Sequence, residues 1–307
     1  MADRLKEIEE LLPDRLKKAI FKDAFPFKIT YDGLEEIRLR CMQPVGIRFH
    51  GRDYLSENVR VYREDIRRCL EYMSNYSLYA FQEDIKHGYI TVRGGHRVGV
   101  LGKAMVDKEN VVGQQFLSFL NIRVAHELPG CADKIMNFVY KNNCLKHTLI
   151  VSPPGCGKTT LLRDIIRQLS VGTVSEGRKV CVIDERSEIA GCLEGIPQND
   201  LGPRTDVIDG CPKADGMLMV IRAMSPDIVA IDEIGGKRDI EALQYIVNCG
   251  CTVIGTIHAA SIDELYKKPD FAVLLKKGIF TRFILLSGKN GAGTVLECRE
   301  LAKTQKG

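Results

Sequence analysis

Residues 148–159 read Thr-Leu-Ile-Val-Ser-Pro-Pro-Gly-Cys-Gly-Lys-Thr, and this stretch decides the fold of the chain. The segment from Thr148 to Val151 is apolar and β-branched, as in a buried strand, and a helical pattern follows at residues 160–169. Glycines between a strand and a helix let backbone N–H groups turn toward a phosphate, and the helix N-terminus favours its negative charge. The order of strand, glycine-rich loop and helix therefore predicts a phosphate-binding loop.

The polar residues that close this loop have expected roles. Lys158 should reach the β- and γ-phosphates of a nucleotide, and Thr159 should ligate magnesium. Ser152 stands where the usual pattern begins with a glycine, a position that matters less to the phosphates than Gly157 does. The residues that we expect to line the nucleotide are Ser152, Pro153, Pro154, Gly155, Cys156, Gly157, Lys158, Thr159 and Thr160.

Two acids follow a second apolar run. Residues 228–231 read Ile-Val-Ala-Ile, and Asp232 and Glu233 come directly after them. Open parallel sheets bind ligands at the carboxyl ends of their strands, so both acids should lie beside the phosphate loop. We expect Asp232 to hold the magnesium of the nucleotide through water. Glu233 should orient and polarise the attacking water, which predicts a hydrolase rather than a kinase.

Two more polar groups are candidates at the same edge of the sheet. Glu188, in the acidic cluster at residues 184–188, is either a second carboxylate that positions water or magnesium, or part of a charged turn. His258 ends the apolar run 252–257, where it either senses the γ-phosphate by donating a hydrogen bond or has a structural role. The position of His258 relative to the other motifs favours the sensing role.

The nucleotide is expected to be ATP. Guanine-specific P-loop proteins read the base with an Asn/Thr-Lys-x-Asp motif. The nearest string here, Lys267-Lys-Pro-Asp270, begins with the wrong residue. The expected cofactors are therefore ATP and Mg²⁺.

From residue 127 onward, apolar runs alternate with helical stretches. This alternation is typical of a parallel sheet that is covered by helices on both faces. The break at His126-Glu-Leu-Pro-Gly130 places a linker at residues 127–134, between an N-terminal domain (1–126) and an ATPase domain (135–307). The predicted fold class is α/β, a RecA-like P-loop NTPase domain preceded by a smaller α+β domain. The predicted strands of the larger domain are residues 148–151, 180–183, 228–231, 252–257 and 282–286.

The N-terminal region mixes helices and strands. Apolar residues recur at helical spacing over residues 5–20, and Pro13 in their middle predicts two short helices rather than one. A hairpin is expected around Gly94-Gly95. The further predicted elements are strands at residues 36–41 and 45–49, a helix at 63–86, and the hairpin strands within 88–103.

The register of this hairpin follows from its apolar residues. A two-residue loop would set Arg97 opposite Val92, whereas a three-residue loop, Gly94-Gly95-His96, pairs Val92 with Val98. We expect the three-residue loop. It puts Arg93 and Arg97 side by side on the polar face, where two cations are costly unless an anion or a carboxylate lies between them. The alternative is that both arginines belong to a solvated face of the sheet.

The composition fits a folded protein. The chain has 307 residues, of which 45% are apolar, and its formal net charge is +4. That balance is too small to indicate nucleic-acid binding, and no apolar run approaches the roughly 20 residues that cross a bilayer. The 11 cysteines form no C-x-x-C pair, which is typical of reduced thiols in the cytoplasm. Cys249, Cys251 and His258 are a possible metal site, but positions in the core are favoured for them.

Several motifs together resemble the secretion ATPases of type II and type IV systems and the pilus motors. Residues 221–235, Asp239-Ile-Glu-Ala242 and Thr256-Ile-His-Ala259 match these enzymes in order and spacing. The cluster at 184–188 resembles their Asp box, and residues 256–259 resemble their His box. These enzymes often have Gly-Glu where this chain has Asp232-Glu233, so magnesium ligation here is expected to follow the general RecA pattern.

Motifs along nearly the whole chain resemble the stage III sporulation protein AA family. The resemblance implies an ATPase of endospore-forming bacteria that acts in the cytoplasm of the mother cell, peripheral to the membrane. Its implied partners are membrane proteins of the same operon, in a secretion-like channel into the forespore. The motifs are Ser77-Leu-Tyr-Ala80, Gly88-Tyr-Ile-Thr-Val, Gly94-Gly-His-Arg-Val-Gly99, Arg204-Thr-Asp206 and Cys211-Pro-Lys-Ala214.

Secretion ATPases of this type work as hexamers and bind nucleotide between an N-terminal domain and the P-loop domain. The resemblance implies a homo-hexamer in which Arg93, Arg97 or Arg123 reaches the phosphates, with Arg204 and Arg222 as rival arginine fingers from a neighbouring subunit. We expect ATP binding to draw the two domains together and hydrolysis to release them. The alternatives are a nucleotide-dependent scaffold with little turnover and a RecA-like nucleic-acid motor.

Overall fold

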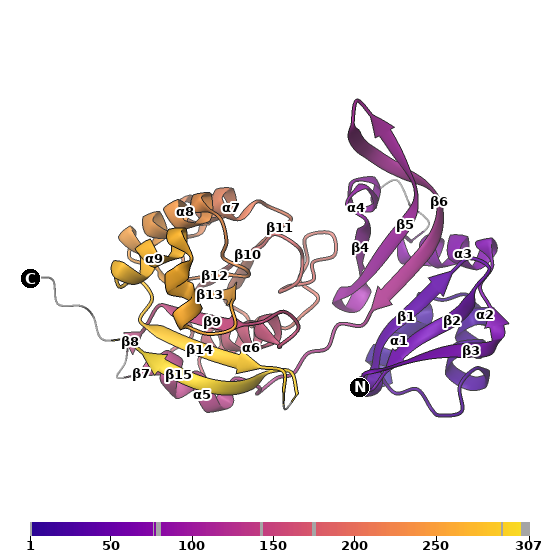
Figure 1. The fold of residues 1–307 in the computed structure, drawn as a ribbon, viewed down its shortest axis with the longest axis horizontal. Coiled ribbons are helices and arrows are strands. Elements are labelled where there is room, and N and C mark those ends of the chain that lie inside the picture. The colour runs from indigo at the N-terminus through magenta and orange to yellow at the C-terminus, as the bar shows by residue number, and fades with distance from the viewer. Residues whose placement is uncertain are drawn as a thin grey trace, which may run out of the picture. The chain divides into compact units, whose positions relative to one another are not determined.

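The computed structural model describes residues 2–75, 77, 81–141, 144–173, 176–289 and 291–301, and the chain divides into two compact units (Figure 1). Unit 1 comprises Met1–His126 and Gly191–Gln198, and unit 2 comprises Glu127–Ala190 and Asn199–Gly307. The sequence patterns had placed the segment Gly191–Gln198 with the ATPase domain. It groups with unit 1, where the Gln198 side chain accepts the backbone N–H of Gly94 at 3.3 Å.

Unit 1 is built on a six-stranded antiparallel sheet with the strand order β3-β2-β1-β6-β5-β4. Side chains alternate between the two faces of a strand, so every second residue enters the core, as Ile37 and Leu39 do in β1. The strands are β1 Leu34–Arg40, β2 Pro44–Phe49, β3 Arg52–Arg60, β4 Tyr89–Val92, β5 His96–Asp107 and β6 Asn110–Arg123.

The helices of unit 1 bury their apolar residues in the same core as the sheet, as Ile8, Leu16 and Ile66 show. Pro13 lies between the first two helices, so the predicted pair of short helices is confirmed. The helices are α1 Ala2–Glu10, α2 Asp14–Lys18, α3 Arg63–Met73 and α4 Gln82–Lys86, with a π-helical turn at Ala19–Asp23 and 3₁₀ turns at Tyr31–Gly33 and Arg93–Gly95.

The single helix predicted at residues 63–86 is wrong. α3 ends at Met73, and Asn75 has a φ of 46°, a left-handed conformation that ends an α-helix. α4 is a separate short helix. Three residues of the quoted motif, Leu78, Tyr79 and Ala80, lie outside the described residues.

The hairpin of β4 and β5 forms as predicted, but its register differs from the expected one. Val92 pairs with His96 and Ile90 pairs with Val98, so the loop is Arg93–Gly95. Val92 was expected to pair with Val98, so the observed pairing is shifted by two residues. The apolar side chains therefore stay on the buried face, because the faces of a strand alternate with a period of two.

The reason for the shift is the environment of His96. This side chain is fully buried, and its Nδ1 accepts the backbone N–H of Ala125 at 3.0 Å. His96 thus belongs to the strand, and Arg93 moves into the turn. The predicted side-by-side placement of Arg93 and Arg97 is therefore wrong.

Unit 2 is built on a seven-stranded sheet with the order β11-β10-β12-β13-β9-β14-β15. The six strands from β11 to β14 are parallel, and β15 runs antiparallel to β14. This arrangement confirms the predicted α/β fold class and all five predicted strands. The strands are β9 Thr148–Ser152, β10 Val180–Asp184, β11 Thr205–Asp209, β12 Ile228–Ile231, β13 Thr252–His258, β14 Arg282–Ser287 and β15 Thr294–Glu300.

Helices cover both faces of this sheet (Figure 1). α7, α8 and α9 pack on one face through Met217, Leu243 and Phe271, which share a core with Leu149 and Val151 of β9. α6 lies on the other face. The helices are α5 Asp133–Val139, α6 Lys158–Val171, α7 Lys213–Met224, α8 Lys237–Asn248 and α9 Pro269–Lys276, with a 3₁₀ segment at Asp263–Lys267 and the small strand pair β7 Tyr140–Lys141 and β8 Cys144–Leu145.

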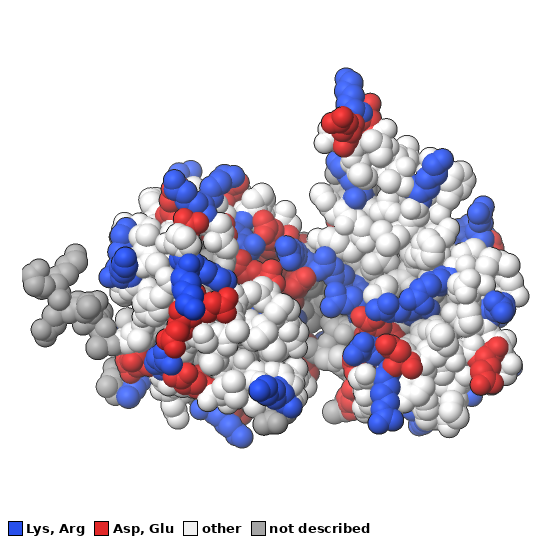
Figure 2. Space-filling view, in the orientation of Figure 1, with Lys and Arg blue, Asp and Glu red and all other residues white. Residues whose placement is uncertain are grey.

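The surface carries charges of both signs. Figure 2 shows acidic and basic side chains interspersed on the visible face of each unit, in keeping with the net charge of +4. No helix in the described part of the chain is long and apolar enough to cross a bilayer. The described residues contain no group of three or more His, Cys, Asp and Glu side chains placed to hold a metal. Cys251 is buried as expected, and its thiol donates to the Pro226 carbonyl at 3.1 Å, whereas Cys249 is exposed and does not belong to the core.

Candidate nucleotide-binding site

The predicted phosphate loop joins β9 to α6 at the carboxyl edge of the parallel strands. Gly155 and Gly157 have φ angles of 72° and 85°, which glycine adopts without strain. A Cβ on Gly157 would lie 2.8 Å from the backbone nitrogen of Gly293, whose N–H donates to the Cys156 carbonyl at 2.8 Å. The turn between β14 and β15 therefore supports the loop, a contact that sequence patterns did not reveal.

The loop fits a phosphate group. No atom lies within 4 Å of the place that a Cβ of Gly155 would take, so the backbone there is open, and α6 begins directly after the loop. Two side chains shape the loop from within. Ser152 is fully buried and donates to the Pro153 carbonyl at 2.7 Å, and the Cys156 thiol donates to the Pro154 carbonyl at 3.6 Å.

Lys158 takes part in a chain of contacts that runs across the site. Its side chain is buried, and the ammonium nitrogen lies 3.0 Å from Nδ1 of His258. An ammonium group can only donate, so Nδ1 accepts, and the ring proton sits on Nε2. Nε2 in turn lies 2.7 Å from Oε1 of Glu233, to which it donates. The burial of Lys158 lowers the pKa of its ammonium group, although Asp232 and Glu233 act against this shift.

Thr159 and Asp232 meet at the start of α6. The Thr159 hydroxyl donates to Oδ2 of Asp232 at 2.8 Å, and the buried Thr256 hydroxyl donates to Oδ1 of the same carboxylate. Hydroxyl and carboxylate oxygens are the ligands that Mg²⁺ prefers, so Thr159 and Asp232 fit a magnesium ion. Sequence reasoning missed Thr256, because an apolar strand gives no signal for the partner of one hydroxyl in its middle.

Glu233 is held in an uncommon backbone conformation, with a φ of 53°. Its N–H donates to the Thr256 hydroxyl at 2.8 Å, which fixes this conformation. Burial alone would raise the pKa of Glu233, but the hydrogen bond with His258 and the charges of Arg186 and Lys158 leave that pKa below its usual value. Arg186 lies 3.3 Å from Oε2 of the glutamate. Glu233 is therefore ionised at neutral pH, as a group that accepts a proton or orients water must be.

Asp184 organises the loop that carries Glu188. Its buried carboxylate accepts the backbone N–H groups of Glu188, Ile189 and Ala190 at 2.8, 3.0 and 2.8 Å. Burial raises the pKa of Asp184 to about 6, although these hydrogen bonds favour its ionised form. Arg163 of α6 donates to the carbonyls of Glu188 and Ile189 at 2.9 and 2.8 Å. The sequence indicated an acidic cluster here. It did not show that Asp184 has a structural role, whereas the Glu188 side chain lines the site.

Glu188 shares one recess with both acids that follow β12. We refer to this recess as the acidic recess, and it lies beside the carboxyl ends of β10 and β12 in unit 2. The structure thus brings Glu188 and Glu233 together, as the sequence predicted for neighbouring strand ends. The lining residues of the acidic recess are Asp184, Glu185, Arg186, Glu188, Lys213, Asp232 and Glu233.

The arginines expected from the N-terminal domain lie in unit 1. Arg97 and Arg123 are direct cross-strand partners in β5 and β6, whereas Arg93 lies in the turn before β5. The Arg97 guanidinium lies 3.8 Å from the centre of the Tyr89 ring, and Nε of Arg123 lies 3.9 Å from Oε1 of Glu36. The two cations that face each other are thus Arg97 and Arg123.

The two rival finger residues differ in their surroundings. Arg204 donates to the Ser170 carbonyl at 2.8 Å and fills the space beside Gly177, so it joins the end of α6 to the segment before β11. Arg222 lies exposed on α7. The geometry of Arg204 gives it a structural role within unit 2.

A parallel sheet with a phosphate loop after β9 and paired acids after β12 defines the class of RecA-like P-loop NTPase folds. Within that class, the profile of the family "Sporulation stage III, protein AA" matches residues 2–302, and the chain belongs to this family. The chain is 42% identical over 293 residues to stage III sporulation protein AA of Bacillus subtilis (strain 168), and the match covers 95% of this chain and 94% of that protein.

Solved structures show the same fold. The pilus retraction motor PilT, solved with bound ADP, gives a TM-score of 0.57 at 17% identity, over 89% of this chain and 76% of PilT. The ATPase DotB of Yersinia pseudotuberculosis gives a TM-score of 0.57 at 14% identity, over 83% of this chain and 71% of DotB. Because the sequence identities are below 20%, these similarities establish the fold alone. It is the fold of the secretion ATPases.

Proposed function

We propose that this protein hydrolyses ATP to ADP and phosphate. The observation that carries this proposal is the convergence of Lys158, Thr159, Asp232 and Glu233 at one edge of the sheet. The Thr159 hydroxyl and the Asp232 carboxylate are 2.8 Å apart, and Lys158 and Glu233 contact the same histidine ring at 3.0 and 2.7 Å. A cation for the phosphates, oxygen ligands for magnesium and an ionised glutamate are the parts that phosphoryl transfer to water requires.

In the proposed reaction, each residue of the site in unit 2 has its own role. Thr159 directly and Asp232 through water would hold Mg²⁺, which would supply neutralisation of charge on the phosphates. Lys158 turns from His258 to the β- and γ-phosphates. Glu233 orients and polarises the attacking water, while the Nε2–H of His258 keeps the carboxylate in place. For His258 to donate to the γ-phosphate as well, Nδ1 would have to carry a proton in addition to Nε2. Glu188, which lines the same acidic recess, positions water.

We further propose that unit 1 supplies arginines to the phosphates. Arg97 and Arg123 are paired across β5 and β6, with the Glu36 carboxylate 3.9 Å from Nε of Arg123, and two adjacent cations favour a further anion such as phosphate. Arg93 in the neighbouring turn is the third candidate. ATP would then draw residues 1–126 toward residues 135–307 across the linker at 127–134, and hydrolysis would release them.

The biological role that we propose is that of a motor for a sporulation channel between mother cell and forespore. Membership of the sporulation family and the fold of secretion ATPases support it. The proposed form is a homo-hexamer in the cytoplasm, peripheral to the membrane and docked on membrane proteins of the channel. The proposed nucleotide is ATP, and no nucleic acid is part of the proposal.

This role is tested by ATP turnover at increasing protein concentration, with the assembly state recorded by light scattering. A shared-site ring predicts that turnover per subunit rises as rings form, and that Arg97→Ala and Arg123→Ala lower turnover within assembled rings. Constant turnover per subunit across the assembly transition would contradict the ring. If ATP binds without turnover, even in the presence of the membrane partners, the protein would be a scaffold. If single-stranded nucleic acid stimulates turnover, the protein would be a nucleic-acid motor.

A further inference from the structure

A small hairpin follows the segment that carries Glu188, and we call its residues, Gly191–Gln198, the finger. Both ends of the finger continue into unit 2, whereas the finger itself groups with unit 1. We propose that Gln198, the last residue of the finger, is a positioning residue that couples the turn of Arg93 in unit 1 to Glu188 in the acidic recess. This inference rests on the proposed function, in which Arg93 is a candidate for binding phosphate and Glu188 positions water.

The tip of the finger is a tight turn. Leu193 and Ile196 exchange two backbone hydrogen bonds, of 3.0 and 2.9 Å. Between them, Glu194 and Gly195 have φ angles of 51° and 78°, and positive values at both central residues are what a type I′ hairpin turn requires. Pro197 follows, and its ring fixes its own φ. These constraints leave the finger little conformational freedom, so it moves as one piece.

The Gln198 side chain joins the finger to the turn of Arg93. Its amide nitrogen donates to the Ile196 carbonyl at 3.0 Å, within the finger, and its amide oxygen accepts the backbone N–H of Gly94 at 3.3 Å. Gly94 directly follows Arg93, and its carbonyl accepts a hydrogen bond from Arg4 of α1 at 3.1 Å. The turn is thus held by α1 and by Gln198. A displacement of the turn therefore displaces Gln198 as well.

The residue after Gln198 bonds directly to the segment of Glu188. Asn199 is buried, and its side-chain amide donates to the Ile189 carbonyl at 2.9 Å. Its backbone N–H donates to the Ala190 carbonyl at 3.0 Å, which closes the finger at its base. Ile189 directly follows Glu188 in the chain. A continuous path of covalent and hydrogen bonds thus leads from the turn in unit 1 to Glu188.

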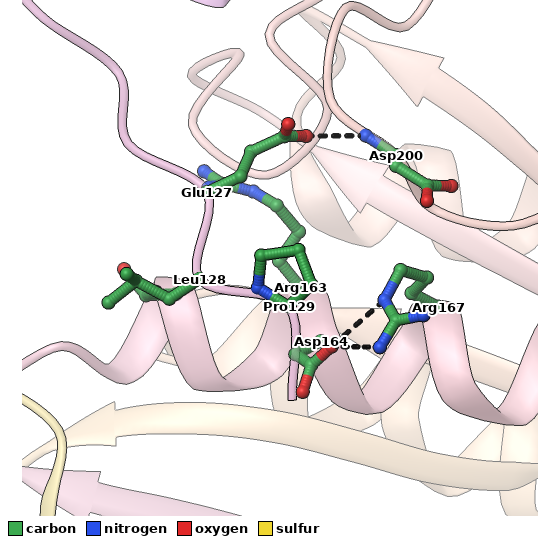
Figure 3. Close-up of a pocket in the computed structure, with 8 residues that line it drawn as sticks. Glu127, Leu128, Pro129, Arg163, Asp164, Arg167 and Asp200 are labelled. Atoms are coloured by element: carbon green, nitrogen blue, oxygen red, sulfur yellow. Dashed lines mark hydrogen bonds and ion pairs between the residues drawn. The ribbon is translucent and has the colours of Figure 1, made fainter. Parts of the chain in front are cut away.

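Contacts within unit 2 hold the chain on both sides of the finger. After Asn199, the backbone N–H of Asp200 donates to the Glu127 carboxylate at 2.6 Å, as Figure 3 shows. Before the finger, Arg163 of α6, also drawn in Figure 3, donates to the Glu188 carbonyl at 2.9 Å. α6 begins directly after the phosphate loop. The segment of Glu188 is therefore tied to the nucleotide site by α6 and to unit 1 by the finger.

Coupling through the finger makes hydrolysis depend on the position of unit 1. A coupling free energy acts in both directions, so the state that holds Glu188 in place is also the state that holds the turn of Arg93 in place. Loss of the contact between Gln198 and Gly94 frees both side chains at once. The glutamate that positions water and the arginine of unit 1 are thus ordered together, which prevents ATP hydrolysis while unit 1 is out of place.

The test is a double-mutant cycle on the full chain, with kcat for ATP hydrolysis and Kd for MgATP measured for each variant. Gln198→Ala should lower kcat about fivefold, the effect of one lost hydrogen bond, and leave Kd within about twofold. Because Gln198 acts through Glu188, adding Gln198→Ala to Glu188→Ala should slow turnover by less than about twofold further. Gln244→Ala is the matched control, since it removes a glutamine that accepts Lys277 at 2.7 Å on the surface of unit 2. An unchanged kcat in Gln198→Ala, or effects that multiply in the double variant, would overturn the inference.

Hydrogen exchange measured by mass spectrometry tests the coupling without turnover. Gln198→Ala should raise the exchange of the N–H groups at residues 188–190 several-fold, whereas Gln244→Ala should not. If Glu188→Ala lowers kcat but exchange at 188–190 is unchanged in Gln198→Ala, the inference fails and the proposed function stands. If wild type does not hydrolyse ATP, or Glu188→Ala hydrolyses it at the wild-type rate, the proposed role of Glu188 fails and the inference falls with it.

Discussion

Lys158 and His258 lie 3.0 Å apart, with the lysine ammonium directed at Nδ1 of the imidazole. This contact fixes the proton of the ring on Nε2 and so directs it at Glu233. The lysine that is expected to bind phosphates is therefore linked, through one ring, to the glutamate that is expected to orient water. The first prediction follows from this link.

His258→Ala should lower kcat for ATP hydrolysis by about tenfold or more, because Glu233 loses the donor that orients it. The dissociation constant for MgATP should stay within about threefold, since the phosphates are bound by other groups. Steady-state kinetics together with calorimetric titration checks both values. His147→Ala, which removes an acceptor of the Val253 N–H elsewhere in the sheet, is the control for general damage. A loss of binding as large as the loss of turnover would show that His258 holds the nucleotide instead.

Substitution of the two loop glycines should have unequal effects. Both have positive φ, but a Cβ on Gly157 would meet the backbone of Gly293 at 2.8 Å, whereas a Cβ on Gly155 meets nothing within 4 Å. Gly155→Ala should therefore cost about 1–2 kcal/mol of backbone strain, and Gly157→Ala clearly more. Urea unfolding and MgATP titration measure the two variants side by side. Equal free energies of unfolding would contradict the contact between the loop and the β14–β15 turn.

Asp184 should be needed for turnover more than for binding. Asp184→Ala leaves the N–H groups of Glu188, Ile189 and Ala190 without their acceptor, so Glu188 loses its fixed position. We expect a loss of stability of about 1–3 kcal/mol and a lower kcat, with little change in affinity for MgATP. Asp209→Ala is the control, because Asp209 accepts the Ser187 hydroxyl in the same region. An unchanged kcat in Asp184→Ala would remove Glu188 from the proposed mechanism.

Unit 1 should lose stability in mild acid because of His96. Burial, with a smaller contribution from the charge of Arg4, lowers the pKa of His96 from 6.5 to about 4. The unfolded chain binds this proton first, so stability is complete above pH 6.5 and is lost as the pH falls from 6.5 toward 4. The loss from this group amounts to roughly 3 kcal/mol. Thermal unfolding between pH 7 and 4 measures it.

His96→Gln keeps an acceptor for the Ala125 N–H but does not titrate, so its stability should change less over this pH range. His50→Gln, at an exposed position, should behave like wild type. If wild type and His96→Gln lose the same stability between pH 7 and 4, another group causes the acid sensitivity of unit 1.

Elements whose structure is determined by neighbouring residues could be predicted from the sequence, and elements that depend on distant contacts could not. The phosphate loop and its neighbouring strands could be predicted, because the residues from Thr148 to Thr159 determine strand, turn and helix start by themselves. The β4–β5 register could not, because it depends on the hydrogen bond between His96 and Ala125, 29 residues away. The positions of Arg97 and Arg123 opposite each other depend on a second register, that of β5 and β6.

Roles that require tertiary contacts were also beyond the sequence. Asp184 and Glu188 look alike in a cluster of acids, and only the fold shows that one is buried and accepts three N–H groups. Thr256 in an apolar strand gave no sign that it would bond both Asp232 and the Glu233 backbone. The nucleotide roles of these residues stay predictions, as do the domain boundaries at 126 and 135.

The most direct test of ATP hydrolysis is phosphate release from γ-labelled ATP by wild type, Glu233→Gln and Lys158→Ala, with MgATP affinity measured on the same samples. Wild type should release phosphate. Glu233→Gln should bind MgATP with nearly unchanged affinity and release phosphate about a hundredfold or more slowly, whereas Lys158→Ala should lose affinity as well. Phosphate release by Glu233→Gln at the wild-type rate would contradict the site described here.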